Sequence, residues 1–366
     1  MANNSKVNIS YVMNVLNGEP FIKFQLDSIY PHAHQIIIIE GAYVKFSHAA
    51  SLEGRSIDRT TEIINNYLDP DNKIVFVQKI GFYDDRLDMC NEFFEHVTGD
   101  VIWQVDVDEF YLDSTHIYVK KIFSDNLELD RVCFNFYDFF GSLNYYVRGY
   151  ENIGLDNIRR VHRYVSGDTW SDQRPPTIMA KNERKVIRSE ESGKSMELKG
   201  HMMFHPTLLF DQQIKDKYKY YSSISSSVNS PDKWIDRVWL DYKNKFNVSG
   251  IKNHVTYLGK FEGSNYPTAL VDMYSVVKNG GYEDFRIRNM EDVDNFFAST
   301  LSNGYKEIAQ DLFVYLYSDV CQSNIRVFLK LIFRAIKTLD RHTLVQFLRV
   351  IFRQSLKNML KRLKIV

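Results

Sequence analysis

Residues 101–110 read VIWQVDVDEF and predict a buried β-strand that ends in a group of carboxylates. The β-branched and aromatic first half is typical of a strand that is covered on both faces. Asp106, Asp108 and Glu109 follow where this strand would reach the carboxyl edge of its sheet, the edge at which open α/β sheets bind ligands. Alternation along a strand would place Asp106 and Asp108 on one face, where two carboxylates repel each other unless a cation or a shared proton intervenes. The pair therefore indicates a metal site.

A D-x-D sequence alone is weak evidence, because a helix cap or a solvated acidic turn after a strand has the same composition. The sequence context favours the metal, since three strand–helix units precede this stretch. The expected strands are 6–16, 35–39 and 73–77, and the expected helices are 20–29, 58–68 and 84–97. Strands that alternate with helices imply right-handed crossovers and a mainly parallel sheet with helices on both faces. The first 110 residues thus predict an α/β, Rossmann-like nucleotide-binding fold.

The regular alternation stops after this stretch. Further strands are expected at 131–140 and 159–165, and residues 170–176 predict a rigid polar turn that suits a pocket wall as well as an ordinary loop. Another strand is expected to end near His205, followed by a helix with Pro206 in its first turn. The remaining chain predicts a C-terminal helical extension.

Composition excludes several classes of protein. The 366 residues are 44% hydrophobic and 25% charged, which is ordinary for a globular protein. The N-terminus lacks the basic and apolar regions of a secretory signal, and no apolar run is long enough to span a bilayer, so we expect a cytoplasmic protein. Cys90, Cys133 and Cys321 are odd in number and widely spaced, which suits reduced thiols better than disulfides or a zinc site.

The last 43 residues differ from the rest in charge. Residues 324–366 contain 11 Lys and Arg and one Asp, which gives +10 and leaves −10 on the remainder of a chain whose net charge is zero. Basic residues recur every three or four positions between apolar ones, as in helices that bind anionic membrane surfaces. A helical hairpin docked on the acidic remainder or in a dimer is the alternative. The expected domains are 1–225, 226–323 and 324–366.

Several of these features together resemble glycosyltransferases of the A-type fold (GT-A), particularly the family 2-like bacterial enzymes that use nucleotide sugars. The resemblance covers roughly residues 7–221. It is carried by Asn17-Gly18-Glu19, the strand end at Glu40, Asp58-Arg59-Thr60, Arg86, Asn91, the D-x-D sequence at Asp106 and Asp108, and His205 with the helix expected after it. The chain departs from the family in a longer loop between Glu40 and Asp58 and in the separation of Arg86 from Asn91.

The resemblance implies roles for individual residues. The residues implied in nucleotide-sugar binding are Asn17, Glu19, Glu40, Asp58, Arg86, Asn91, Asp106 and Glu109. The implied ligands of Mn²⁺ or Mg²⁺ are Asp106, Asp108 and His205. Competing interpretations are helix capping for Asp58 and a packed or capping side chain for His205, while His201 is a weaker candidate ligand.

The implied reaction is transfer of a sugar from a nucleotide-sugar donor, a UDP-sugar by resemblance, to a hydroxyl of a glycan or glycolipid at the inner face of the membrane. The metal would neutralise the departing diphosphate. Inversion at the anomeric carbon would need a carboxylate base, for which Asp172 is the candidate and Glu190 and Glu191 are competitors. A surface-loop role for Asp172 is an equal alternative, and retention could use the leaving phosphate instead.

Two other functions fit the same stretch. A nucleotidyltransferase also uses paired aspartates, but the Gly-Ser that normally precedes its D-x-D is absent before Asp106. A membrane-associated scaffold could keep a glycosyltransferase fold without turnover. No feature predicts nucleic-acid binding.

Overall fold

The computed structural model describes residues 7–150, 157–173, 176–180, 183–184, 187–224, 234–240, 248–249, 256–298, 307–308, 325–339, 344–345, 347–348 and 351–352. The chain forms two compact units that are interleaved in sequence. Unit 1 contains Met1–Tyr137, Asp156–His205 and Gly263–Glu283, and unit 2 contains Asp138–Leu155, Pro206–Glu262 and Asp284–Val366. The domain boundaries expected after residues 225 and 323 fall outside the described residues.

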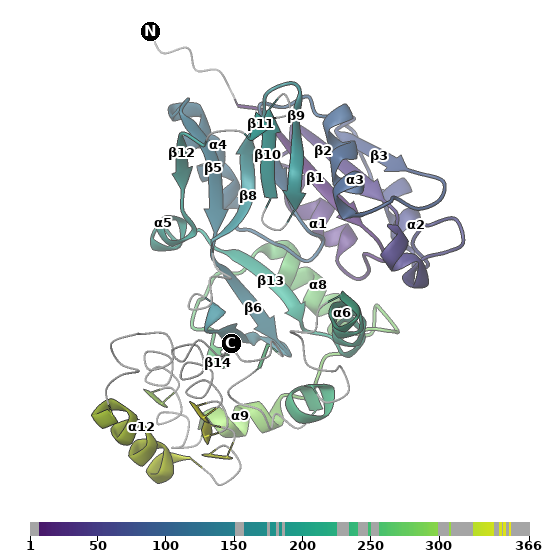
Figure 1. Cartoon of the computed structure of the whole chain (residues 1–366). Helices are drawn as coiled ribbons and strands as arrows, with labels where there is room; N and C mark the ends of the chain where they lie inside the picture. The colour runs from purple at the N-terminus through teal and green to yellow at the C-terminus, as the bar shows by residue number, and fades with distance from the viewer. Residues whose placement is uncertain are drawn as a thin grey trace, which may run out of the picture. The chain divides into compact units, whose positions relative to one another are not determined.

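Unit 1 is built on a seven-stranded sheet (Figure 1). In spatial order its strands are β12 (Ser189–Glu191), β5 (Leu129–Phe134), β8 (Ile158–Arg163), β4 (Val101–Gln104), β1 (Ile9–Val15), β2 (Gln35–Glu40) and β3 (Ile74–Gln78). β8 runs antiparallel to both of its neighbours, and every other neighbouring pair is parallel. The predicted mainly parallel sheet flanked by helices is therefore confirmed.

The helices of unit 1 are α1 (Ile22–Ile29), α2 (Thr60–Asn65), α3 (Arg86–Asn91), α4 (Asp113–Asp125), α5 (Gly193–Leu198) and α8 (Thr268–Lys278), with 3₁₀ turns η1 (Val44–Ala49) and η2 (Glu92–Glu95). The β-α-β-α-β-α-β order predicted for the first 110 residues is confirmed. The expected helices at 58–68 and 84–97 are shorter than predicted, because α2 covers only two turns and α3 passes into the 3₁₀ turn η2.

The two faces of the large sheet are covered by different elements. Alternate residues of one strand, such as Tyr11 and Val12 of β1, belong to different hydrophobic clusters. The cluster that contains Tyr11 packs against apolar residues of α1, α2 and α4, whereas the cluster that contains Val12 packs against α3, β9 (Asp168–Gln173) and β10 (Pro176–Ala180). Both faces are buried, which explains why the central strands have almost uninterrupted apolar sequences.

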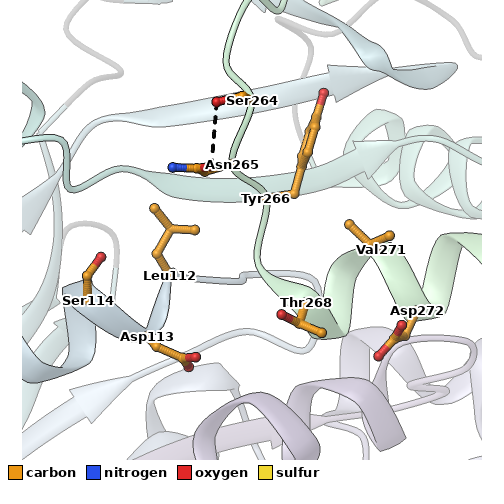
Figure 2. A pocket seen from close by; sticks show the side chains of 9 residues that line it. All are labelled: Leu112, Asp113, Ser114, Ser264, Asn265, Tyr266, Thr268, Val271 and Asp272. Atoms are coloured by element: carbon orange, nitrogen blue, oxygen red, sulfur yellow. Dashed lines mark hydrogen bonds between the residues drawn. The ribbon is translucent and has the colours of Figure 1, made fainter.

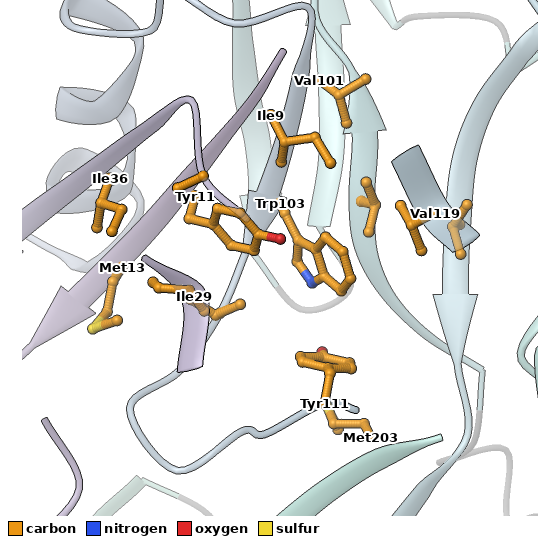
Figure 3. Packing of buried hydrophobic residues seen from close by; sticks show 14 of the residues in the cluster. Ile9, Tyr11, Met13, Ile29, Ile36, Val101, Trp103, Tyr111, Val119 and Met203 are labelled. Carbon is orange, nitrogen blue, oxygen red and sulfur yellow. The ribbon is translucent and has the colours of Figure 1, made fainter. Parts of the chain in front are cut away.

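Trp103 of β4 lies in the centre of one of these clusters (Figure 3). Its ring stacks on Tyr11 at 5.3 Å between centroids and on Phe134 at 5.6 Å, and it meets Tyr111 edge-on at 5.0 Å. The residue is fully buried. The rings that contact Trp103 come from β1, from β5 and from the segment after β4, so β4 is anchored by packing on this face of the sheet.

Two expectations for the middle of the chain are wrong. The expected turn at 170–176 contains most of strand β9, which forms an antiparallel hairpin with β10 and buries Trp170. Pro206 lies in strand β13 (Met203–Leu208) and not in a helix, because the next helix, α6 (Asp211–Ile224), begins only at Asp211. A proline is tolerated at a strand position that donates no ladder hydrogen bond.

Unit 2 contains much of a second, four-stranded sheet of order β13-β6-β7-β14, which was not predicted. Its other strands are β6 (Phe136–Phe140), β7 (Ser142–Arg148) and β14 (Tyr257–Lys260). A third sheet has the order β11-β10-β9, with β11 at Glu183–Arg184. In the part of the chain that the structure describes, the remaining helical elements are the π-helix η4 (Ile235–Leu240), α9 (Glu291–Ala298) and α12 (Ile325–Thr338).

Among the described residues, no helix is both long and apolar enough to cross a membrane. Cys90 and Cys133 are buried free thiols, as predicted, whereas Cys321 lies outside the described residues.

We expect Trp103→Ala to destabilise the protein by about 3–5 kcal/mol, because it removes a fully buried side chain from a close-packed cluster. Guanidinium unfolding monitored by circular dichroism would measure this change. Leu52→Ala is the matched control, since Leu52 is 100% exposed and its truncation should change the free energy of unfolding by less than about 0.5 kcal/mol. Equal effects of the two substitutions would contradict the packing described for Trp103.

Candidate functional site

The carboxyl ends of β1, β2 and β4 meet at one edge of the large sheet. Their parallel registers align Val15 with Glu40 and Val12 with Gln104, so the segments after these strands begin side by side. β8 runs the other way and pairs Trp103 with Val161, which brings the beginning of β8 to the same edge. Because ligands of open α/β sheets bind at this edge, it is the candidate site.

The acidic residues after β4 are organised by a buried arginine of β8. The Nε atom of Arg160 donates to Glu109 Oε2 at 2.8 Å, and its Nη2 atom donates to Glu109 Oε1. The same Nη2 atom also donates to Asp106 Oδ2 at 3.3 Å. The Glu109 side chain is only 1% exposed, so its charge is compensated inside the protein by the guanidinium. Glu109 is therefore an internal partner of Arg160.

The charges of this cluster shift the pKa of Arg160. Burial alone would lower the pKa of the guanidinium, but the Glu109 and Asp106 carboxylates raise it above its usual value. The two carboxylates therefore stabilise the charged form of Arg160. Two hydrogen bonds close the turn: the backbone N–H of Glu109 donates to the backbone oxygen of Asp106 at 3.1 Å, and the backbone N–H of Asp106 donates to the Glu109 side chain at Oε2, at 3.2 Å.

Asp108 is directed to a different partner. Its Oδ2 atom lies 3.7 Å from Nε2 of His205, on β13, and both side chains are partly exposed. The predicted alternation of Asp106 and Asp108 on one strand face is wrong, because β4 ends at Gln104 and the two aspartates lie in the turn that follows. The structure nevertheless brings His205 to Asp108 from nearly a hundred positions away in the sequence.

The Asp108–His205 pair has the chemistry of a partial metal site. Two ligands of one Mg²⁺ ion, each at about 2.1 Å, lie at most about 4.2 Å apart, and the observed 3.7 Å is within this limit. No group of three His, Cys, Asp or Glu side chains suited to a metal ion occurs among the residues that the structure describes. Two protein ligands are compatible with Mg²⁺, which usually keeps waters and takes further oxygens from substrate phosphates. Asp106 as a third ligand stays a prediction.

Two of the residues implied in nucleotide binding hold the long loop after β2 in place. Asn17 accepts from Ile57 N and donates to Ala49 O, both at 2.8 Å. Glu40 accepts from Ser56 N at 2.6 Å and from Gln78 at 2.9 Å. These side chains sit at the expected edge, and their hydrogen bonds shape its rim. Direct contact with a nucleotide stays a prediction.

Asp58 and Glu19 belong to the same rim. Asp58 accepts from the backbone N–H of Glu19 and of Thr60, each at 3.0 Å, and Glu19 accepts from Arg59 Nε at 2.7 Å. Burial raises the pKa of Glu19, and the neighbouring Arg59 opposes this rise. The hydrogen bond from Thr60 N to Asp58 is of the kind expected if Asp58 capped the helix. However, α2 begins at Thr60, and Arg59 occupies the cap position.

Arg86 and Asn91 lie on α3 and have different surroundings. Asn91 donates to Trp170 O at 3.2 Å and accepts from Trp170 N at 2.8 Å, which ties α3 to β9. Arg86 lies beside Cys90, where burial raises the pKa of the thiol to about 12 despite this cation. Cys90 is therefore inert at neutral pH. The nucleotide-binding roles of Arg86 and Asn91 stay predictions.

The candidate bases are spread over several elements. Asp172 is an exposed residue of β9 opposite Thr177 of β10. Glu190 forms an ion pair with Arg131, and Glu191 forms one with Lys199. The Asp172 assignment stays a prediction.

His201 precedes β13 and makes its own contacts. It shares a hydrogen bond with Thr115 at 3.1 Å and stacks on Tyr118, which is the arrangement of a packed histidine.

Arg160 is the residue of the site that the sequence interpretation missed. It lies 51 positions after Glu109, so no local motif links the two. The sequence IRRVHR of β8 could have indicated such a residue. A strand that lies between two others and contains this many basic residues requires acidic partners.

No protein-family model matches the sequence, and no curated protein matches it either. Structural similarity was found to mannosyltransferase PcManGT of Pyrobaculum calidifontis with GDP-Man and Mn²⁺, at 16% identity over 37% of this chain and 38% of that chain, with a TM-score of 0.29. S. aureus TarS with UDP-GlcNAc has 17% identity over 35% of this chain and 34% of that chain, with a TM-score of 0.27.

Glucosyl-3-phosphoglycerate synthase of Mycobacterium tuberculosis with Mn²⁺ and UDP has 13% identity over 44% of this chain and 58% of that chain, with a TM-score of 0.30. This chain therefore spans less than two thirds of the length of each of these three structures.

We expect Arg160→Met to cost about 3–5 kcal/mol of folding free energy, because it leaves the Glu109 carboxylate buried without its partner. The double substitution Arg160→Met with Glu109→Gln should recover much of this loss, since glutamine keeps the shape and removes the charge. Guanidinium unfolding of the two single variants and the double variant measures the coupling. Additive losses would show that the two side chains do not interact as described.

Proposed function

We propose that this chain is a glycosyltransferase that moves a sugar from a nucleotide-sugar donor to a hydroxyl of a glycan or glycolipid. The observation that carries the proposal is the convergence of Asp106, Asp108, Glu109, Arg160 and His205, here called the acidic cluster, at the carboxyl edge of the parallel strands. Open α/β sheets bind nucleotides at this edge, and the rim made by Asn17, Glu40 and Asp58 lies beside it.

The charge of the acidic cluster explains why the donor needs a cation. Its three carboxylates are opposed by one guanidinium, and Arg160 is already engaged by Glu109 and Asp106. A diphosphate that approached this edge would therefore be repelled. A divalent cation held by Asp108 and His205 would reverse that repulsion, and Mn²⁺ or Mg²⁺ accepts this mixture of carboxylate, imidazole and phosphate ligands.

The residues of the site have different roles in the proposed reaction. When bound, the metal would stabilise negative charge on the departing diphosphate. Arg160 orients Glu109 and Asp106, so that the turn keeps one shape before the donor binds. His205 presents a ring nitrogen from β13, and deprotonation of this ring is a condition for its binding a metal. Asp172 is the candidate base that takes the proton of the acceptor hydroxyl. The expected donor is a UDP-sugar.

We expect Mn²⁺-dependent release of nucleoside diphosphate from a nucleotide sugar to fall about 100-fold in Asp108→Asn and in His205→Gln. The assay is a coupled nucleoside-diphosphate assay over a panel of UDP- and GDP-sugars, with EDTA as a second means of removing the metal. Asp71→Asn, in an exposed turn after α2, is the matched control. Unchanged turnover in both variants would reject the metal assignment, and release of pyrophosphate would indicate a nucleotidyltransferase.

We further propose that α12 binds an anionic membrane surface, where a lipid-linked acceptor would be available. Leu331 and Ala335 of α12 are buried in a cluster of unit 2. Another side of the helix exposes Leu329, Phe333 and Ile336, which are 57%, 60% and 57% exposed. Lys330, Arg334 and Lys337 follow these three residues in sequence and are also exposed. This combination of apolar and basic side chains on one helix suits the boundary between anionic headgroups and acyl chains.

The triple substitution of Leu329, Phe333 and Ile336 by serine should reduce cosedimentation with phosphatidylglycerol-containing vesicles about tenfold or more, because each buried apolar side chain contributes to insertion. Leu68, Ile80 and Leu198 are 84%, 82% and 78% exposed, so their triple serine variant is the control. Equal binding of both triple variants and the unmodified protein would reject α12 as the contact surface. The expected helical segments after residue 352 lie outside the described residues.

A further inference from the structure

A cavity of about 520 Å³ lies in unit 1 between the start of α4 and the start of α8 (Figure 2). Leu112, Asp113 and Ser114 line it from the α4 side. Tyr266, Thr268 and Asp272 line it from the α8 side. Its volume is within the range of pockets that bind small molecules. None of these residues belongs to the acidic cluster or to the rim around Asn17.

The lining of the cavity suits a neutral ligand that carries many hydroxyl groups. Asp113 and Asp272 offer carboxylate acceptors, and Ser114 and Thr268 offer hydroxyls that both donate and accept. No lysine or arginine lines the cavity among the described residues, although the Asp113 carboxylate has a neighbouring imidazole, with His32 Nε2 at 2.9 Å from its Oδ1 atom. An anionic ligand would therefore meet two carboxylates and no Lys or Arg side chain in the lining. A sugar hydroxyl donates to a carboxylate and accepts from a neutral donor at the same time.

The backbone supplies further donors at the same place. Leu112 and Pro267 occupy the N-cap positions of α4 and α8, and neither forms a side-chain hydrogen bond that caps its helix. The first N–H groups of a helix have no partner within the helix, so they can donate to ligand oxygens. The cavity therefore presents donors and acceptors in the mixture that a polyhydroxylated molecule requires.

Tyr266 gives the cavity an aromatic wall. Its ring packs against Phe204, with 6.2 Å between the ring centroids, and the side chain is only partly buried. An aromatic ring held by a second ring offers a preformed apolar surface for the C–H face of a sugar. Figure 2 shows Tyr266 and Thr268 on the same segment, with Leu112 and Asp113 on the α4 side.

Short segments of the chain connect the residues that line the cavity to the acidic cluster. Leu112 is four residues after Asp108, so their Cα atoms lie within about 14 Å of each other. Phe110 and Phe204 are bridged by two backbone hydrogen bonds, at 2.9 Å and 2.8 Å. Phe204 therefore touches Tyr266 on one side and is followed by His205, the partner of Asp108.

We propose that this cavity is an acceptor subsite that binds a neutral sugar unit of a glycan, with Tyr266 as the stacking surface and Asp272 as a hydrogen-bond acceptor. Its place in sugar transfer rests on the proposed function, whereas the binding of a neutral sugar does not. Within that function, the subsite selects acceptors whose terminal unit is an uncharged hexose or hexosamine derivative and excludes phosphorylated ones.

Saturation-transfer NMR on the full chain tests this proposal, with the methyl glycosides of glucose, galactose, mannose and N-acetylglucosamine as probes. At least one glycoside should receive saturation from the unmodified protein. The signal should fall about tenfold in Tyr266→Ala, which removes the stacking ring, and in Asp272→Asn, which removes the negative charge of the hydrogen-bond acceptor. Tyr266→Phe should retain most of the signal, since the ring remains.

Asp125→Asn is the control for charge, because Asp125 lies at the far end of α4 and pairs with Lys121 on the surface. No transfer to any glycoside, or transfer that survives in both Tyr266→Ala and Asp272→Asn, overturns the proposal. Broadening of the ³¹P signal of inorganic phosphate, together with the absence of glycoside binding, also overturns it. The experiment contains no nucleotide, so its failure is distinguishable from failure of the nucleotide-sugar assay.

Discussion

The ion pair between Arg160 and the buried Glu109 determines how the acidic residues after β4 are used. The guanidinium binds both oxygens of a carboxylate that is 1% exposed and also reaches Asp106 in the same turn. Removal of either charge would leave the other buried, so the pair holds the turn in one shape. Asp108 is left to meet His205 from β13. One stretch of acidic sequence thus contributes to two different side-chain pairs, Glu109 with Arg160 and Asp108 with His205.

The strands of the large sheet are held in place by burial on both of its faces. Residues such as Trp103 and Ile102 alternate between two hydrophobic clusters, and this two-sided burial holds β4 between β1 and β8. The rigid strand then delivers the acidic turn to the edge where the rim residues Asn17 and Glu40 already converge. A site built on the ends of buried strands keeps its geometry better than one built on loops.

The elements of the first 110 residues could be predicted because their signals are local. The run QIIII and the helical spacing of Ile22, Leu26 and Ile29 each specify one element without knowledge of its neighbours. The structure of the middle of the chain could not be predicted in the same way. β9 carries polar residues around Trp170, and it forms a strand because β10 pairs with it and α3 covers it. Pairing of this kind is a tertiary effect that overrides local propensity.

The site could be predicted only in part for a similar reason. The position of Asp108 follows from the strand before it, and His205 was identified through the family resemblance. Arg160 could not be identified, because its place depends on an antiparallel strand inserted between parallel ones. Asp106 and Asp108 were expected on one strand face, but β4 ends before them. The turn that contains Asp106 is shaped by the guanidinium from the inserted strand and not by a continuing strand.

The interleaving of the two units has a consequence for any attempt to divide the protein. α8 belongs to unit 1 and packs on α1, yet it is encoded after a long segment of unit 2. A fragment that stops at residue 225 would contain every residue of the acidic cluster but would expose the side of α1 that α8 covers. Such a fragment is expected to be prone to aggregation. A single genetic truncation therefore cannot release unit 1, because segments of unit 2 separate its parts in the sequence. A circular permutation, or an insertion at a point where the chain crosses between the units, keeps the segments of both units.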